Sequence, residues 1–273
     1  MGILVRLCVR LFTALIGLLV WNASYALDLA VPERTAEVVN ALKQGSWQRQ
    51  DEGIDVLRTI TRDGMVITTY RISPEQFSID VVLQDIETGS YAKDIGEREG
   101  AILAVNGGFF AQTEAGKLYS VGYLRLAGTV FSKGWPSAGG LVEIDDGDLG
   151  LRATHAGIPK NGKDVLQTKP MIMESGGKWS MGSDLGKLKN RTLLCKLKNG
   201  DVIFVLITRV GMSLYEAGWV LRAKDEGGFF GCDAAVALDG GSSTQVWYSG
   251  RPALSYSSIA PVQNFIVVRF RDN

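Results

Sequence analysis

The sequence predicts an α+β fold in a single domain, with mixed or antiparallel β-sheets and three or four helices. Hydrophobic residues make up 46% of the 273 residues and charged residues 21%, the composition of a chain with an ordinary buried core. Short segments rich in Val, Ile and Thr recur without regular alternation with helices, so the pattern of a parallel βαβ sheet is absent. The 33 glycines indicate many tight turns, as antiparallel sheets require.

The first 26 residues are predicted to be a secretory signal peptide. Arg6 and Arg10 precede an uncharged run from Leu11 to Trp21, and the small residues Ser24 and Ala26 follow. This order is typical of a cleaved signal, and the run is shorter than the ~20 apolar residues of a membrane span. An uncleaved N-terminal anchor is the alternative. We expect residues 27–273 to form one folded domain, periplasmic or secreted, with no membrane span after cleavage.

The elements of the predicted domain follow in order from residue 34. Apolar spacing predicts a helix over 34–44 that ends at Gly45, and a second short helix over 90–98. Ser213 and Glu216 form a capping-box pattern at the start of a third helix, which we expect to end at Gly227. Strand-like composition covers 54–60, 64–72, 77–86, 101–105, several short stretches within 119–154, and 192–198, 201–208, 234–238, 244–249 and 264–270.

Three turns and two cysteines constrain this scheme further. Asp63-Gly64 and Asn199-Gly200 are strong hairpin signals, and residues 145–148 are better explained as a hairpin turn than as a calcium loop. Cys195 and Cys232 would pair in an oxidising compartment, or would remain two small buried apolar residues. The sequence leaves both possibilities open.

The charge balance excludes some classes of partner. The chain has 29 basic and 29 acidic residues, whereas nucleic-acid binding requires a clustered basic excess. The single histidine, His155, and the few cysteines do not form a zinc motif. We therefore expect no nucleic-acid partner, no metal and no cofactor.

Two similar elbows are the features most suggestive of a functional site. Asn106-Gly107-Gly108 follows one buried strand, and Asp239-Gly240-Gly241-Ser242-Ser243 follows another. A glycine pair lets a ligand approach backbone N–H groups, which can form an anion-binding nest. Asp239 is a plausible acid, base or nucleophile, because an unpartnered carboxylate at a buried strand end is costly. Asn-Gly and Asp-Gly also make ordinary turns, which is the alternative explanation.

Two further segments could supply charge for phosphate. Arg191 precedes Thr192 at the start of a strand, and an arginine there can hold phosphate with its planar fork. Lys169 follows Gln167 and Thr168 and could be a second phosphate-binding charge.

These motifs together resemble the phosphodiester glycosidase family. The resemblance rests on four segments in this order and at similar spacing: Asn106 to Phe110, Gln167 with Pro170, Arg191-Thr192, and Leu238 to Ser243. It extends over roughly residues 65–270. The chain departs from the family pattern at Lys169, where Gly is common, and at Leu193-Leu194-Cys195, where small residues and Gly are common.

The resemblance implies a hydrolase that cleaves the bond between a sugar anomeric carbon and a phosphodiester, in a glycan or envelope polymer. Bacterial relatives are often associated with exopolysaccharide. The family's motif residues carry over onto Asn106, Gly107, Arg191, Asp239, Gly240 and Ser242. From the chemistry of the residues we expect Asp239, Asn106 and Arg191 to be catalytic, with Asp239 as nucleophile or base. The substrate's phosphate would bind to residues of the elbows and the neighbouring strand, namely Gly107, Gly108, Thr192, Gly240, Gly241, Ser242 and Ser243.

Two other functions stay open at the level of sequence. A non-catalytic envelope module would bind polysaccharide or protein, with Trp135, Trp179, Trp219, Trp247 and Tyr248 as stacking platforms, although such residues more often pack a core. A serine hydrolase is less well supported, because no nucleophile-elbow motif is present and only His155 could act as base.

Overall fold

The computed structural model describes residues 32–51, 53–84, 87–160, 164–257 and 259–271, which contain nineteen strands, three α-helices and four short 3₁₀ helices. The helices are α2 (Glu33–Gln44), α3 (Ala92–Arg98) and α4 (Leu214–Leu221). Every strand pairing between the described strands is antiparallel, as in an α+β fold. The predicted signal peptide, residues 1–26, lies outside the described residues.

The largest sheet has eight strands. Its central strand is the long β16, which pairs with β3 on one side and with β15 on the other. In spatial order the strands are β1 (Gln48–Asp51), β2 (Ile54–Ile60), β3 (Val66–Ile72), β16 (Val202–Met212), β15 (Lys189–Lys196), β17 (Ala234–Ala237), β13 (Met171–Glu174) and β14 (Lys178–Trp179).

Two smaller sheets and a hairpin contain the remaining strands. The five-stranded sheet has the order β11 (Asp148–Ala153), β10 (Gly140–Asp145), β12 (Asp164–Thr168), β8 (Tyr123–Leu126) and β9 (Thr129–Lys133). The four-stranded sheet has the order β18 (Val246–Tyr248), β5 (Leu103–Asn106), β19 (Asn264–Phe270) and β4 (Phe77–Leu83). The hairpin is β6 (Phe110–Gln112) with β7 (Leu118–Ser120).

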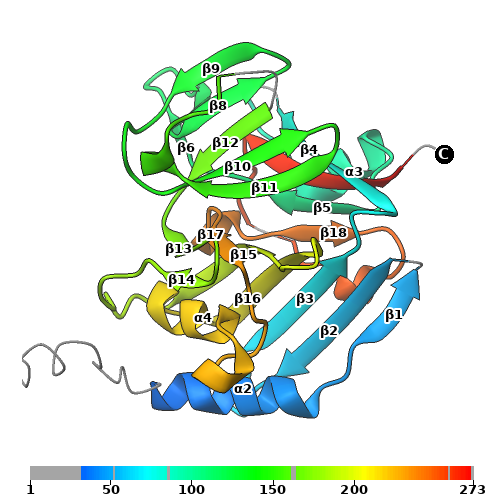
Figure 1. The fold of residues 1–273 in the computed structure, drawn as a ribbon. Coiled ribbons are helices and arrows are strands. Elements are labelled where there is room, and N and C mark those ends of the chain that lie inside the picture. The colour runs from blue at the N-terminus through cyan, green and yellow to red at the C-terminus, as the bar shows by residue number, and fades with distance from the viewer. Residues whose placement is uncertain (1–31, 52, 85–86, 161–163, 258, 272–273) are drawn as a thin grey trace, which may run out of the picture. The chain divides into compact units, whose positions relative to one another are not determined.

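The large sheet is buried on both faces. Alternate side chains of a strand point to opposite faces, and in β16 Ile203, Val205 and Ile207 belong to one hydrophobic cluster while Val202, Phe204 and Leu206 belong to another. The first cluster is completed by α2 and α4, and the second by residues of the two smaller sheets. Figure 1 shows the two helices on one face of this sheet and the smaller sheets on the other. Helix α3 covers the outer face of β5 and β19.

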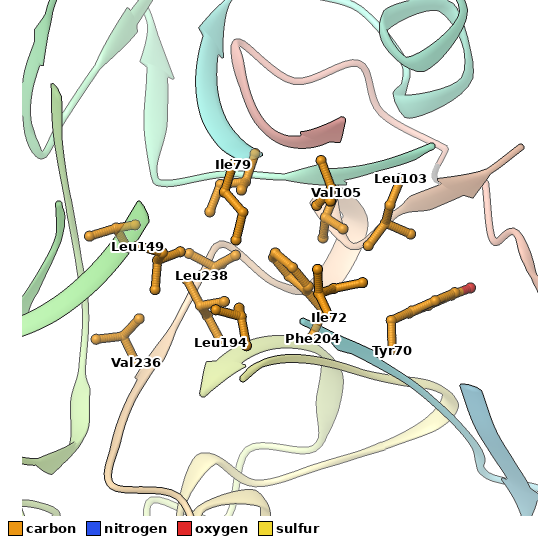
Figure 2. Packing of buried hydrophobic residues seen from close by; sticks show 14 of the residues in the cluster. Tyr70, Ile72, Ile79, Leu103, Val105, Leu149, Leu194, Phe204, Val236 and Leu238 are labelled. Atoms are coloured by element: carbon orange, nitrogen blue, oxygen red, sulfur yellow. The ribbon is translucent and has the colours of Figure 1, made fainter. Parts of the chain in front are cut away.

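The core between the sheets anchors the two elbows. Val105, directly before Asn106, and Leu238, directly before Asp239, are both buried in the same cluster. Figure 2 shows them among side chains of the large sheet, such as Leu194 and Phe204. Fixed apolar neighbours at both strand ends hold the polar residues that follow in defined positions.

Most of the elements expected from sequence are confirmed, and the third helix is shorter than predicted. The helix at 34–44, the strands flanking the three turn signals and the Ser213–Glu216 capping box are all present. The prediction that the third helix ends at Gly227 is wrong, because it ends at Leu221. The N–H groups of Phe229 and Phe230 bond to the carbonyl of Val220, so the returning chain satisfies the helix end early. Gly227 instead caps a separate 3₁₀ turn.

Cys195 and Cys232 form a disulfide across a sequence separation of 37 residues. The bond joins β15 to the segment that enters β17, and both cysteines are buried. This resolves the choice left open by the sequence in favour of a bridge. No helix in the described ranges is long and apolar enough to span a membrane.

Replacing both cysteines by Ser tests the contribution of this bridge. Cross-linking a loop of this length restricts the unfolded chain, so the free energy of unfolding should fall by about 3–4 kcal/mol. Urea denaturation of the parent and the double variant measures the difference. A loss below about 1 kcal/mol would contradict the expected contribution.

Candidate active site

The Asn106 side chain joins the two elbows. It is fully buried at the end of β5, and its Oδ1 accepts hydrogen bonds from the Thr192 hydroxyl at 2.8 Å and the Gln245 N–H at 3.1 Å. Its Nδ2 donates to the carbonyl of Asp239 at 2.7 Å, while the Asp239 N–H donates to the carbonyl of Gly107 at 3.0 Å. Segments more than 130 positions apart in the sequence therefore meet at one point, as the elbow hypothesis requires.

Glycine is required in each elbow because another chain segment lies against it. A Cβ added at Gly107 would lie 2.2 Å from Oδ1 of Asn264, and one added at Gly240 would lie 2.8 Å from the carbonyl of Asn190. Both distances are shorter than real Cβ contacts allow. The glycines are therefore needed first for packing between protein segments.

The first elbow does not provide the predicted anion nest. The Gly107 N–H donates to the carbonyl of Asn264, and the Gly108 N–H donates to Oδ1 of the same residue at 2.6 Å. Asn264 thus occupies both of the N–H donors that were expected to bind phosphate at Gly107 and Gly108. Thr192 is buried and donates its hydroxyl to Asn106, so it also belongs to the scaffold.

Asp239 is half-buried at the second elbow. Its carboxylate accepts hydrogen bonds from the Gly240 N–H at 2.9 Å and from the Ser243 hydroxyl. Burial raises the pKa of Asp239 above its usual range, an effect larger than the opposing one of these two donors and of the nearby Lys189 charge. The carboxyl group is thus positioned and electrostatically perturbed, as acid–base and nucleophilic groups commonly are.

The outer part of the second elbow has free donors. The N–H groups of Gly241 and Ser242 have no partner among the described residues, and the Ser242 side chain is exposed. Ser243, by contrast, is buried and bonded to Asp239. Gly241 and Ser242 therefore stay candidates for substrate contact, whereas Gly240 and Ser243 support the carboxylate.

Arg191 lies at the site with most of its guanidinium already engaged. Its Nε donates to the carbonyl of Met212 at 2.8 Å, and one Nη donates to the carbonyl of Lys187 at 2.5 Å. Burial lowers the pKa of Arg191 below its usual range, and the Asp184 charge partly opposes this. Two nitrogens of the guanidinium are thus bonded to backbone carbonyls, one at the end of β16 and one in the loop before β15. One Nη edge is left for a ligand.

A cavity of about 400 Å³ adjoins the second elbow. Four cationic side chains line it, from Lys169, Lys187, Lys189 and Arg191, with Asp184 the acidic lining residue. Its other lining residues are Phe109, Pro170, Met181, Ser183, Leu185, Ser213, Leu214 and Tyr215. Asp239 is not a lining residue. It is connected to the cavity through Lys189, whose charge acts on it and whose side chain would lie 3.8 Å from a Cβ added at Gly241.

The cavity is bordered by the segment from Gln167 to Pro170. Gln167 is fully buried and bonds to the backbone of Tyr123, Trp135 and Ala138, which fixes the loops on either side. Lys169 is exposed, and its Nζ lies 4.2 Å from the Trp135 ring centroid. Within the described ranges no group of three His, Cys, Asp or Glu side chains could hold a metal ion.

The aromatic residues considered as sugar platforms mostly pack the interior. Trp219 and Tyr248 are buried, Trp179 packs against Trp219 at 5.9 Å between ring centroids, and the Trp247 ring covers Gly96 of α3. Trp135 is the exception, since it packs against Phe109 and lies beneath Lys169 beside the cavity.

Sequence reasoning missed three residues of the site. Asn264 and Gln245 are buried polar residues within strand-like segments, and such residues at buried positions signal a specific hydrogen-bonding role. Lys189 carried no signal, because its approach to the second elbow depends on how the loop before β15 folds.

The antiparallel α+β fold thus presents a perturbed carboxylate beside a cationic cavity. The sequence model of the phosphodiester glycosidase family matches residues 99–269. This range covers well over half of the chain, which therefore belongs to the phosphodiester glycosidase family, as its motifs indicated.

Three solved structures share the fold. A hypothetical protein from Synechocystis is 16% identical, with a TM-score of 0.59 over 83% of this chain and 64% of its own length. The catalytic domain of zebrafish N-acetylglucosamine-1-phosphodiester alpha-N-acetylglucosaminidase, auto-inhibited by its pro-peptide, is 12% identical, with a TM-score of 0.57 over 84% of this chain and 88% of its own. A Burkholderia pseudomallei protein named as exported is 13% identical, with a TM-score of 0.56 over 76% and 74%. No protein with curated function matches the chain.

Substitution of Asn106 by Ala should destabilise the protein strongly. It leaves the Thr192 hydroxyl, the Gln245 N–H and the Asp239 carbonyl without their partner, so we expect a loss of about 2–4 kcal/mol in the free energy of unfolding. Asn190→Ala, which removes one hydrogen bond to Tyr256, is the matched control and should cost about 1 kcal/mol. Equal losses in chemical denaturation would contradict the role assigned to Asn106.

Substitution of Asp239 by Asn should stabilise the protein at neutral pH. A carboxyl whose pKa is raised on folding destabilises the fold when ionised, and this penalty disappears as pH falls to the unfolded value near 3.8. The variant should therefore unfold at higher urea concentration than the parent at pH 7, with the gap closing toward pH 4. A gap that is independent of pH would show that the carboxyl is not perturbed by folding.

Proposed function

We propose that this protein hydrolyses a glycosyl phosphodiester by breaking the bond between the anomeric carbon and the phosphate oxygen. The observation on which this proposal depends is the carboxyl of Asp239, held at a glycine elbow beside a cavity with four cations. Family membership supports the reaction class. The assignment of residues and of substrate is our own.

The chemistry of the leaving group determines which charges the site must stabilise. Cleavage at the anomeric carbon releases a phosphate monoester, which leaves readily without the strong general acid of ordinary glycosidases. The site must instead stabilise the charge that develops on the phosphate and the positive charge that develops on the sugar ring. The cationic cavity would stabilise the negative charge on the phosphate, and the neighbouring carboxylate would stabilise the positive charge on the sugar ring.

We assign the sugar side of the reaction to Asp239. Its carboxylate would attack the anomeric carbon or activate a water for that attack, and both roles require the ionised form. The hydrogen bonds from Gly240 and Ser243 fix its orientation. Because burial raises the pKa of Asp239, turnover should decline on the acid side at a pH above the usual aspartate range.

We assign binding of the departing phosphate to Lys189, to the Arg191 Nη that makes no hydrogen bond within the described residues, and to the N–H groups of Gly241 and Ser242. Lys189 is exposed, lines the cavity and influences Asp239 electrostatically. A Cβ at Gly241 would lie 3.8 Å from the Lys189 side chain. The Lys189 ammonium and the N–H groups of the second elbow could therefore bind the same phosphate. Asn106 then acts by holding the elbow, without touching substrate.

We further propose that the protein acts outside the cytoplasm, in a periplasm or in the medium. The N-terminal sequence pattern and the disulfide between Cys195 and Cys232 support this location. A phosphorylated glycan of the cell envelope is the substrate class that such a location favours.

The test is hydrolysis of a panel of sugar 1-phosphodiesters, beginning with methyl N-acetylglucosamine 1-phosphate, with products identified by mass spectrometry. Asp239→Asn should lower turnover at least ~100-fold, because its carboxylate acts on the anomeric carbon. The folded state should be retained, as measured by denaturation.

Asp233→Asn is the matched control. Asp233 is also half-buried and flanks the other end of β17, where it accepts an N–H from Gly176. Its turnover should stay near the parent value. Binding of glycans without hydrolysis, unaffected by Asp239→Asn, would favour a non-catalytic binding module instead.

A further inference from the structure

The cavity gathers more positive charge than a single phosphodiester requires. The chain as a whole has equal numbers of basic and acidic residues, yet four cations and one acid line this one cavity. A phosphodiester carries one negative charge. With Asp184 and Asp239 both ionised and a phosphodiester bound, the site would still hold a net positive charge.

The three lysines of the cavity are not used by the fold. Among the described residues no ion pair involves Lys169, Lys187 or Lys189. All three are exposed. Like charges gathered in excess of the nearby acidic groups repel one another, so their clustering is explained by an anionic ligand better than by stability.

The lysines come from two segments of the chain: Lys187 and Lys189 from the approach to and first residue of β15, and Lys169 from the segment that follows β12. Lys189 adjoins the second elbow and acts on Asp239. Lys169 belongs to a different segment, directly after β12, and its ammonium lies over the Trp135 ring, which packs edge-to-face against Phe109 at 6.2 Å. An aromatic face holds a cation without using its N–H donors, so the donors of Lys169 stay available to a ligand.

We propose that the substrate carries a second anionic group, on the moiety esterified to the sugar phosphate, and that Lys169 and Lys187 bind it. This inference rests on the proposed function and defines its substrate class. The second group would be a phosphate or a carboxylate, as in a glycosyl diphosphate or a polymer with repeated phosphates. Lys189 and Arg191 would serve the phosphodiester that is cleaved.

The test uses the Asp239→Asn protein, so that binding is measured without turnover. Calorimetry compares three esters of N-acetylglucosamine 1-phosphate: the methyl, the 2-phosphoethyl and the 2-carboxyethyl ester. The two anionic esters should bind at least about tenfold more tightly than the methyl ester, the effect of one charge-assisted hydrogen bond. A preference between the two identifies the second group as phosphate or carboxylate.

The lysines are tested in the same background. The Lys169→Gln/Lys187→Gln double variant should lose most of the preference for the anionic esters. Lys198→Gln, an exposed lysine beside the Asn199-Gly200 turn and outside the cavity lining, is the control and should keep it. Equal affinities for the three esters, or a preference that survives the double substitution, would overturn the proposal.

Hydrolysis by the parent protein separates the two proposals. If the methyl ester and the anionic esters are cleaved with equal kcat/KM, the proposed function stands and the second anionic group is wrong. If no ester is cleaved while the anionic ones bind more tightly through Lys169 and Lys187, the anion site stands and the proposed reaction is wrong.

Discussion

The site depends on a single buried amide. Asn106 is enclosed at the end of β5, where an unsatisfied polar group would cost several kcal/mol, and every polar atom of its side chain has a partner. Those partners come from β15 and from both sides of the second elbow. The amide therefore fixes three chain segments at once. The position of Asp239 follows from it, because the backbone of Asp239 is bonded to Asn106 and to Gly107.

The charged groups of the site do not stabilise the fold. Asp239 lies where burial disfavours its ionised form, and the lysines that line the neighbouring cavity form no salt bridge within the described chain. Functional sites commonly concentrate such unfavourable groups, while the rest of the structure supplies stability. Here the packed core on both faces of the large sheet, with the Cys195–Cys232 bridge, provides that support.

Local sequence signals predicted the elements and the two elbows, whereas contacts between distant segments were not predictable. Runs of β-branched residues and the Asn199-Gly200 turn depend on nearest neighbours, so their strands were found close to their actual bounds. The end of α4 depended on Phe229 and Phe230 folding back on it. Likewise, Asn264 takes up the donors of the first elbow from 156 positions away, and Arg191 turns most of its fork toward backbone carbonyls.

The placement of the catalytic centre at Asp239 is tested most directly by a structure of the Asp239→Asn protein with an uncleaved glycosyl phosphodiester bound. We predict the anomeric carbon about 3–3.5 Å from a side-chain atom of residue 239, or separated from it by one water, with the phosphate against Lys189 and the second elbow. A ligand seated elsewhere on the protein, with residue 239 out of reach of the sugar, would contradict the assignment of this elbow as the catalytic centre.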